Sequence, residues 1–320
     1  MKENGRKINE IVPEVAEETK ERVTDAYIEL MLARGEDTTH TADFLRKHES
    51  ECGERIARLE SVSSQVDAFL NHVEEKFAGK DSAEHRRIKE ALSLMLKLHI
   101  NQGDRVANGM PFVAHPLAVA ERVLDTYTGA DASFVVVAAL LHDSIEDQSR
   151  LLALEAKLAR SEKYDVSEKS IERDGALTSL GHFFGMRSMT LVSILTSPKI
   201  LETNIPQERK NEIYTRYVSS IFKNDLDEHA AAVIKWADLQ ENAFIGDLYE
   251  RFLSEEADGN EEEAHRVLNF YHSMREKYKP VLEMVREFFE NVDEEHPLYQ
   301  QRDDAITNIT DVLENQYNLV

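Results

Sequence analysis

Cysteine is almost absent from this chain of 320 residues, which contains only Cys52. One cysteine excludes an intramolecular disulfide framework and a zinc site built from several thiolates. The N-terminal segment MKENGRKINEIVPEVAEETK has no apolar core of signal-peptide length. No uninterrupted apolar run reaches the ~18 residues of a membrane span. We therefore expect a cytoplasmic protein that does not insert into a membrane.

Basic residues are outnumbered by acidic ones, with 38 Lys and Arg against 61 Asp and Glu and a formal net charge of -23. Such a surface repels phosphate backbones, so we expect no binding to nucleic acid. A small anionic substrate stays compatible with this charge. A metal ion and a few local Lys or Arg can reverse the field inside one cleft.

Glycine and proline are scarce as well, with 12 and 7 residues, and no proline lies between Pro13 and Pro111. Nothing in that span forbids long helices. Hydrophobic residues make up 42% of the chain and charged residues 31%, which is typical of a folded globular protein. The sequence predicts an all-α fold.

The chain divides into three regions, residues 1–79, 80–290 and 291–320. The first predicts a long helix with one apolar stripe at steps of three and four, formed by Cys52, Ile56, Leu59, Val62, Val66, Phe69, Val73 and Phe77. We interpret the stripe as packing within the chain, because it lacks a sustained heptad with ordered flanking charges. A coiled-coil or dimer contact is the alternative.

The last region predicts one more amphipathic helix, with an apolar face formed by Ala305, Ile306, Ile309, Val312 and Leu313. Its role, like that of residues 1–79, is open. These terminal helices are the candidate contacts for a second copy of the chain or for a protein partner.

The residues with evident chemistry lie in the middle region, beginning with the segment AALLHDSIEDQ at 138–148. An apolar run ends there in His142, Asp143, Glu146 and Asp147, and buried charge is costly unless it is paired or bound to metal. We predict one buried helix through SFVVVAALLHDSIEDQ. On such a helix, residues four apart share a face, so this cluster indicates a metal site.

Two other segments can supply the missing ligands. His115 lies in GMPFVAHPLAVAERVL, where Pro116 suits the first turn of a helix. Asp238 interrupts the apolar segment AAAVIKWADLQENAF, and Asn242 follows one turn later on the same face. Two imidazoles and two carboxylates form a mixed nitrogen and oxygen site. This set suits a divalent first-row ion, manganese or iron before calcium.

The order His…His-Asp…Asp resembles that of the HD phosphohydrolase superfamily. More narrowly, about two thirds of the chain resembles the hydrolase domain of RelA/SpoT-type (p)ppGpp hydrolases, through MPFVAHPLAVAERVL, VAALLHDSIEDQ, FFGMRSMTLVSILT, VIKWADLQENAF and NFYHSMREKYKPVLEMV. The most specific motif is HDxxED, which separates hydrolase-competent members from synthetase-only ones. The resemblance implies an HD-domain helical bundle with additional N-terminal and C-terminal helices.

The resemblance also implies a role for each matching residue. It implies four metal ligands, usually for Mn²⁺, at His115, His142, Asp143 and Asp238. It implies catalytic carboxylates at Glu146 and Asp147 and a nucleotide contact at Asn242. The implied reaction removes the 3′-pyrophosphate of (p)ppGpp and releases pyrophosphate.

The sequence departs from the family on the side that faces the nucleotide. The segment HINQGDRVANGMP is two residues longer than the family pattern and keeps only Arg105 of an Arg-Lys pair. Leu239 follows Asp238 where the family usually has a basic residue. Candidates for a cationic clamp on the substrate are Arg105, Arg209, Lys210 and Lys235.

Two alternatives stay open, the first because of these departures and the second as a protein of a different class. The chain is an HD phosphohydrolase for another nucleotide, such as a dNTP, a nucleoside monophosphate or NADPH, or it is a non-catalytic nucleotide-sensing or scaffold module. The four ligands together with Glu146 and Asp147 argue against the scaffold, because a scaffold has no need for six mutually exposed charges.

Overall fold

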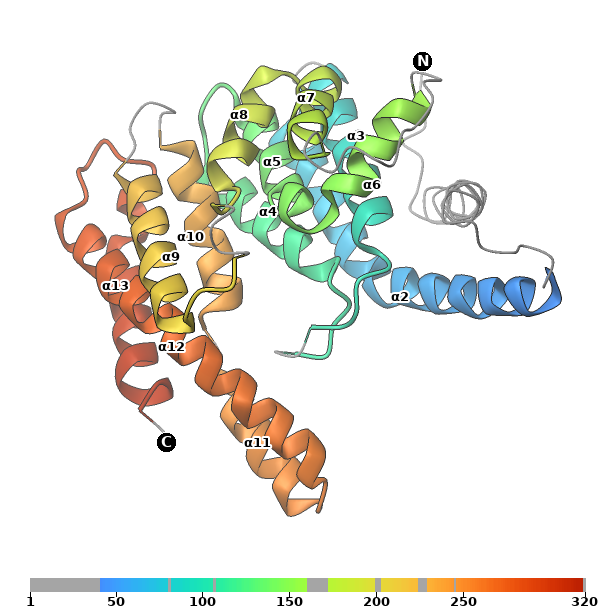
Figure 1. Cartoon of the computed structure of the whole chain (residues 1–320). Helices are drawn as coiled ribbons and strands as arrows, with labels where there is room; N and C mark the ends of the chain where they lie inside the picture. Colours follow the sequence, from blue (N-terminus) through green and yellow to red (C-terminus); the bar gives the residue numbers. More distant parts are fainter. Residues whose placement is uncertain are drawn as a thin grey trace.

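The computed structural model describes residues 41–79, 82–105, 108–159, 172–198, 203–223, 229–244 and 246–318. Every regular element in these ranges is a helix, and no strand occurs among them, which confirms the predicted all-α fold (Figure 1). Within the same ranges, none of the helices has the length and apolar content that a bilayer-spanning segment requires.

The first helices of the described ranges are α2 (Thr41–Lys76) and α3 (Ser82–His99). The stripe residues whose side chains are described are all buried, namely Leu59, Val62, Val66, Phe69, Val73 and Phe77. Helix α2 contacts α3 and α4. This part of the stripe therefore packs within the chain, as predicted. The side chains of Cys52 and Ile56 lie outside the described residues.

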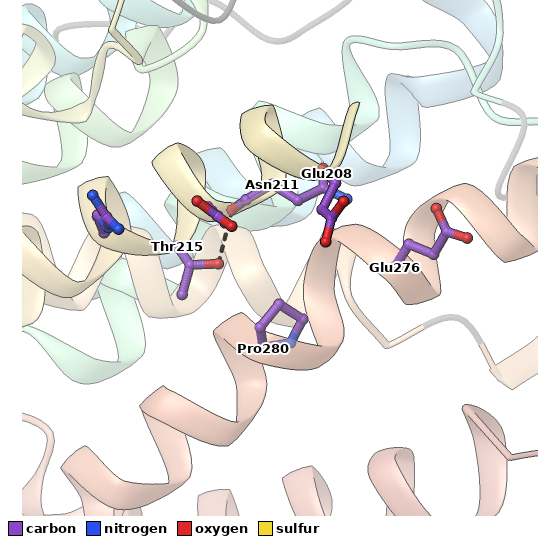
Figure 2. Close-up of a pocket in the computed structure, with 7 residues that line it drawn as sticks. Glu208, Asn211, Thr215, Glu276 and Pro280 are labelled. Carbon is purple, nitrogen blue, oxygen red and sulfur yellow. Dashed lines mark hydrogen bonds between the residues drawn. The ribbon is translucent and has the colours of Figure 1, made fainter. Parts of the chain in front are cut away.

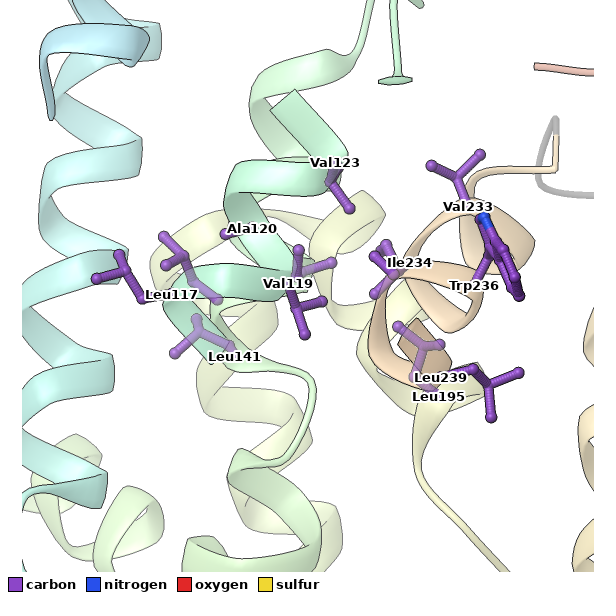
Figure 3. Packing of buried hydrophobic residues seen from close by; sticks show 14 of the residues in the cluster. Leu117, Val119, Ala120, Val123, Leu141, Leu195, Val233, Ile234, Trp236 and Leu239 are labelled. Atoms are coloured by element: carbon purple, nitrogen blue, oxygen red, sulfur yellow. The ribbon is translucent and has the colours of Figure 1, made fainter. Parts of the chain in front are cut away.

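Helices α4 (Ala114–Thr126), α5 (Ala132–Leu141) and α10 (Ala230–Asn242) form the centre of the core. Helix α5 is apolar on all sides, and such a helix is stable only when other elements surround it. Helix α4 packs against both α5 and α10. In Figure 3, Val119 of α4 points toward Ile234 of α10. This packing fixes the spacing between the helices that carry the polar cluster.

The prediction of a single helix through residues 133–148 is wrong, because the structure has two helices there. Helix α5 ends at Leu141, α6 (Ser144–Ala159) begins at Ser144, and His142 and Asp143 form the turn between them. Helix α6 then kinks at Gln148, which has φ -132° and ψ 22°. The break places the two polar residues at a junction between helices, where their side chains reach across to α4 and α10.

Three helices cover the next face of the core. They are α7 (Glu172–Phe184), α8 (Met186–Leu195) and α9 (Gln207–Phe222). Gly185, between α7 and α8, has φ 88°, and a Cβ there would lie 3.2 Å from the Phe134 ring. The turn therefore requires glycine. Helix α8 contacts α5, and α9 contacts α10 and α12.

The C-terminal part consists of α11 (Gly246–Ala257), α12 (Glu261–Asn291), η3 (Tyr299–Gln301), α13 (Arg302–Asp311) and the π-helical turn η4 (Val312–Gln316). The helix predicted in the tail is confirmed, since Ala305, Ile309, Val312 and Leu313 are buried and Ile306 packs against the core. The Trp236 Nε1–H donates to Gln301 Oε1 at 2.9 Å and ties η3 to α10. The described core is continuous across the boundaries predicted after residues 79 and 290, so these do not separate hydrophobic cores.

Candidate metal centre

His142 lies at the C-terminal end of α5 and is only 4% exposed. Its Nδ1 lies 2.8 Å from the carbonyl oxygen of Ala139. Since a carbonyl only accepts, Nδ1 carries the proton that is donated, and in the neutral ring the lone pair is on Nε2. The buried Nε2 has no hydrogen-bond partner among the described residues. A backbone carbonyl that fixes the tautomer in this way is the usual second partner of a metal-binding histidine.

His115 in the first turn of α4 and Asp238 in α10 meet this imidazole. His115 Nε2 lies 3.2 Å from Asp238 Oδ1 and 3.4 Å from Asp143 Oδ2. His142 Nε2 lies 3.2 Å from Asp143 Oδ1 and 3.6 Å from Asp238 Oδ1. The two imidazole centroids are 5.2 Å apart. The structure therefore brings together all four residues that the sequence nominated as metal ligands.

Opposite charges dominate this cluster despite its burial. For Asp238, burial favours the neutral carboxyl, but Lys235 and the two imidazoles outweigh it and hold the pKa well below its usual value. For His142, burial favours the neutral ring, but Asp143 and Asp238 raise its pKa well above the usual value. The site thus attracts positive charge, which either protons or a cation can provide.

The donor set fits a divalent ion. His115, His142 and Asp238 each offer one ligand atom, and these atoms lie within 4.8 Å of one another, so this buried group could hold a metal ion. Two ligands bound at ~2.1 Å to one ion are separated by roughly 3.0–3.5 Å. The nitrogen–oxygen distances in the cluster, 3.2 to 3.6 Å, are close to that spacing. Asp143 contacts both imidazoles and is 23% exposed at its side chain, so it is the ligand candidate nearest to solvent.

Glu146 and Asp147, the predicted catalytic carboxylates, lie on the first turn of α6 and are exposed. The backbone N–H of Ser197 donates to Glu146 Oε1. Gln102 Nε2 donates to Asp147 Oδ2 at 2.9 Å. Although solvent reaches Asp147, its crowded surroundings and then the Asp143 charge raise its pKa to about 6. Both carboxylates are therefore oriented by a donor, and one of them titrates near neutral pH.

The sequence reasoning did not assign a role to His99 and Gln102, which are linked to Asp147 through the Gln102 amide group. His99 Nδ1 is hydrogen-bonded to Gln102 Oε1, and its ring stacks on Phe112 with centroids 5.1 Å apart. Because Gln102 Oε1 only accepts, Nδ1–H of His99 donates to it, and the Gln102 amide group is turned toward Asp147. The spacing His-x-x-Gln at the end of α3 was the signal available in the sequence.

The buried position of His99 leads us to expect that the protein loses stability in acid. It is 1% exposed, and burial lowers its pKa to about 4 from an ordinary value of 6.5. Below pH 6.5 the unfolded chain takes up a proton that the folded chain rejects until about pH 4, so unfolding becomes easier as the pH falls through this window. We expect the free energy of unfolding to fall by roughly 3 kcal/mol more in the wild type than in His99→Gln between pH 7 and pH 4.

Urea titrations with a chelator present at several pH values measure this difference. The matched control is His182→Gln, because His182 is exposed on α7. Parallel pH profiles for the wild type and His99→Gln would contradict the prediction, since carboxylates titrate equally in both proteins.

Of the predicted substrate-binding residues, Arg105 and Asn242 lie beside the cluster. Arg105 Nη2 donates to Asn242 Oδ1 at 2.6 Å, and Asn242 Nδ2 donates to Asp238 Oδ1 at 2.6 Å. This chain of hydrogen bonds connects a guanidinium to the candidate ligand Asp238. Substrate contact itself stays a prediction for both residues.

The other three cations are placed differently. Lys235 is 6% exposed and its Nζ lies 2.7 Å from Asp238 Oδ2, so it faces the protein interior. Arg209 pairs with Glu212 on the surface of α9. In the described part of the chain, no hydrogen bond or ion pair joins Arg209 or Lys210 to the cluster. Among the described residues, Arg209 thus has a local partner but no link to the site, and Lys210 has no link to the site.

A separate groove of about 680 Å³ lies between α9 and α12 (Figure 2). None of the cluster residues lines it, and its lining is mainly acidic and polar: Glu208, Asn211, Glu212, Thr215, Arg216, Glu276 and Pro280. Three glutamates disfavour an anionic ligand there. The groove is therefore distinct from the candidate metal centre.

No family model, curated protein or solved structure matches the chain.

Proposed function

We propose that this protein is a metal-dependent phosphohydrolase of the HD type that acts on a nucleotide. The observation that supports this most strongly is the convergence of His115, His142 and Asp238 from separate helices on one buried point. Asp143 touches both imidazoles, and the two carboxylates of the HDxxED motif follow on the next helical turn. The proposed substrate is (p)ppGpp, from which the 3′-pyrophosphate is released.

The proposed cofactor is Mn²⁺, held by His115, His142, Asp143 and Asp238. Mixed imidazole and carboxylate donors suit manganese or iron better than calcium, which prefers oxygen ligands throughout. A divalent ion, when bound, supplies Lewis acidity toward water and phosphate oxygens. The protein residues then have to bind the substrate, orient it and move protons.

Glu146 is the proposed general base for the attacking water, and Asp147 is its partner. Their exposure on α6 leaves them accessible to a substrate, and each is held by a donor, Ser197 N–H or Gln102 Nε2. Two carboxylates in close proximity tend to separate their pKa values, so that one works as the base and the other as the acid. Asp147 is the one suited to carry a proton near neutral pH.

Arg105 and Asn242 are the proposed contacts to the nucleotide. They lie at the edge of the cluster, and in a protein with a net charge of -23 a local cation is needed to attract phosphate. The buried position of Lys235 favours a role through Asp238 over a direct contact with substrate. Lys210 stays a predicted contact that the geometry does not support further.

A panel of nucleotides tests the proposed function. Purified protein with Mn²⁺ is incubated with (p)ppGpp, dNTPs, nucleoside monophosphates and NADPH, and released pyrophosphate and orthophosphate are measured separately. We expect pyrophosphate from (p)ppGpp. If only another nucleotide were hydrolysed, the proposed substrate would be wrong, but the proposed reaction class would stand. A protein that binds no metal and is inert with Mn²⁺ would favour the scaffold alternative.

A further inference from the structure

Lys235 is a buried cation one turn before the candidate ligand Asp238 on α10. Its Nζ lies 2.7 Å from Asp238 Oδ2, and the side chain is only 8% exposed. The rings of Tyr214 and Tyr217 on α9 cover it, with centroids 5.4 and 5.9 Å from Nζ. The ammonium therefore faces one carboxylate and two aromatic faces.

The two oxygens of Asp238 have separate partners. Oδ2 accepts from Lys235, whereas Oδ1 faces His115 and His142 and accepts from Asn242. These contacts fix the rotation of the carboxylate with one oxygen directed at the imidazoles. All of these partners are protein groups, and together they hold one orientation of Asp238.

We propose that Lys235 is a positioning residue, a built-in counter-ion that holds Asp238 in this orientation in the metal-free protein. The inference rests on the proposed metal centre. It has two physical consequences. An unpaired buried carboxylate is strongly destabilising, so the metal-free fold depends on Lys235. A fixed positive charge beside the same carboxylate also repels a divalent ion, so Lys235 weakens metal binding and keeps the ion exchangeable.

The Lys235→Met variant tests both consequences at pH 8. In the presence of a chelator, we expect its Tm to lie about 10 °C below that of the wild type. Saturating Mn²⁺ should largely close this gap, because the ion compensates the unpaired carboxylate. In calorimetric titration, the Kd of Lys235→Met for Mn²⁺ should be below that of the wild type by a factor of at least roughly three. If Lys235 only supported the fold, its replacement would weaken metal binding. An unchanged or larger Kd for Mn²⁺ in Lys235→Met therefore overturns the inference.

Lys277→Met is the matched control. Lys277 lies over the rings of Tyr214 and Tyr278, at 4.4 and 4.8 Å, so it belongs to the same aromatic cluster. No contact with Asp238 is described for it. We expect Lys277→Met to lower the Tm equally with and without Mn²⁺ and to leave the Kd unchanged. A Mn²⁺-dependent change of the same size in Lys277→Met would overturn the specific role of Lys235.

A double-mutant cycle with Asp238→Asn tests the pairing without any metal. In chelator, we expect each single variant to be less stable than the double variant, because only the single variants leave one buried charge unpaired. The double variant combines Lys235→Met with Asp238→Asn. If it is less stable than both single variants, the inference is overturned. This criterion also applies if Lys235→Met alone fails to fold. Wild-type protein that binds no Mn²⁺ would instead refute the metal centre, and the cycle would still report on the Lys235–Asp238 pair.

Discussion

The His142→Ala variant is expected to lose metal and hydrolysis together while it keeps its helical fold. Removal of the imidazole deletes one of the three buried ligand atoms that lie within 4.8 Å of one another. Loss of a residue that only supports a ligand typically costs 10–100-fold in metal affinity, so loss of a ligand should cost more than about 100-fold. Calorimetric titration with Mn²⁺, metal analysis of the purified protein and the nucleotide assay measure this. Circular dichroism checks the fold.

His182→Ala provides the matched control, because it removes an imidazole from the exposed surface of α7. It should bind Mn²⁺ and hydrolyse nucleotide like the wild type. If His142→Ala retained full metal content, the convergence of imidazoles and carboxylates would be a structural ion-pair cluster. Its two carboxylates would then be balanced by Lys235 and a protonated His142, a state that the raised pKa of His142 permits.

The cluster could be predicted because each of its members lies within a strongly apolar segment. His115, Asp238 and the pair His142-Asp143 interrupt sequences that otherwise have to be buried, and a buried charge requires a partner. The segments that carry them become α4, α10 and the junction of α5 with α6. Local sequence therefore indicated which residues needed partners, and the packing of the helices supplied those partners.

The break between α5 and α6 could not be predicted from the pattern. No glycine or proline marks it, and the apolar period continues from Leu141 to Ile145. The φ and ψ of His142, -59° and -37°, are still helical. The two side chains of the turn face α4 and α10 across the core, and these contacts are tertiary. A single-sequence argument does not contain this information.

Contacts between segments that are far apart in the chain could not be predicted from the sequence for the same reason. The spacing of three between Lys235 and Asp238 placed them on one helical face, but only the covering of α9 shows that the lysine is buried. The link from Gln102 to Asp147 spans 45 residues, and that from Arg105 to Asn242 spans 137. Arg209 and Lys210 had the right charge, yet no contact between described residues joins them to the cluster.

Glu146→Gln is expected to separate metal binding from turnover. The amide keeps the size of the side chain, and its oxygen can still accept from Ser197 N–H, but it cannot take a proton from water. General acid–base groups contribute about 10²–10⁴-fold, so the rate with the preferred nucleotide should fall by at least roughly 10²-fold. The Kd for Mn²⁺ should stay close to that of the wild type, because Glu146 is exposed and outside the buried ligand set.

Glu208→Gln is the control for this charge change, because Glu208 is an exposed glutamate that lines the separate groove between α9 and α12. Its activity should equal that of the wild type. Undiminished turnover in Glu146→Gln would remove Glu146 from the mechanism and leave Asp147 as the only carboxylate of the pair that could serve. Loss of Mn²⁺ from Glu146→Gln would instead make Glu146 a ligand. The contrast with His142→Ala, which should lose the ion first and turnover as a consequence, therefore assigns each residue its role within the proposed metal centre.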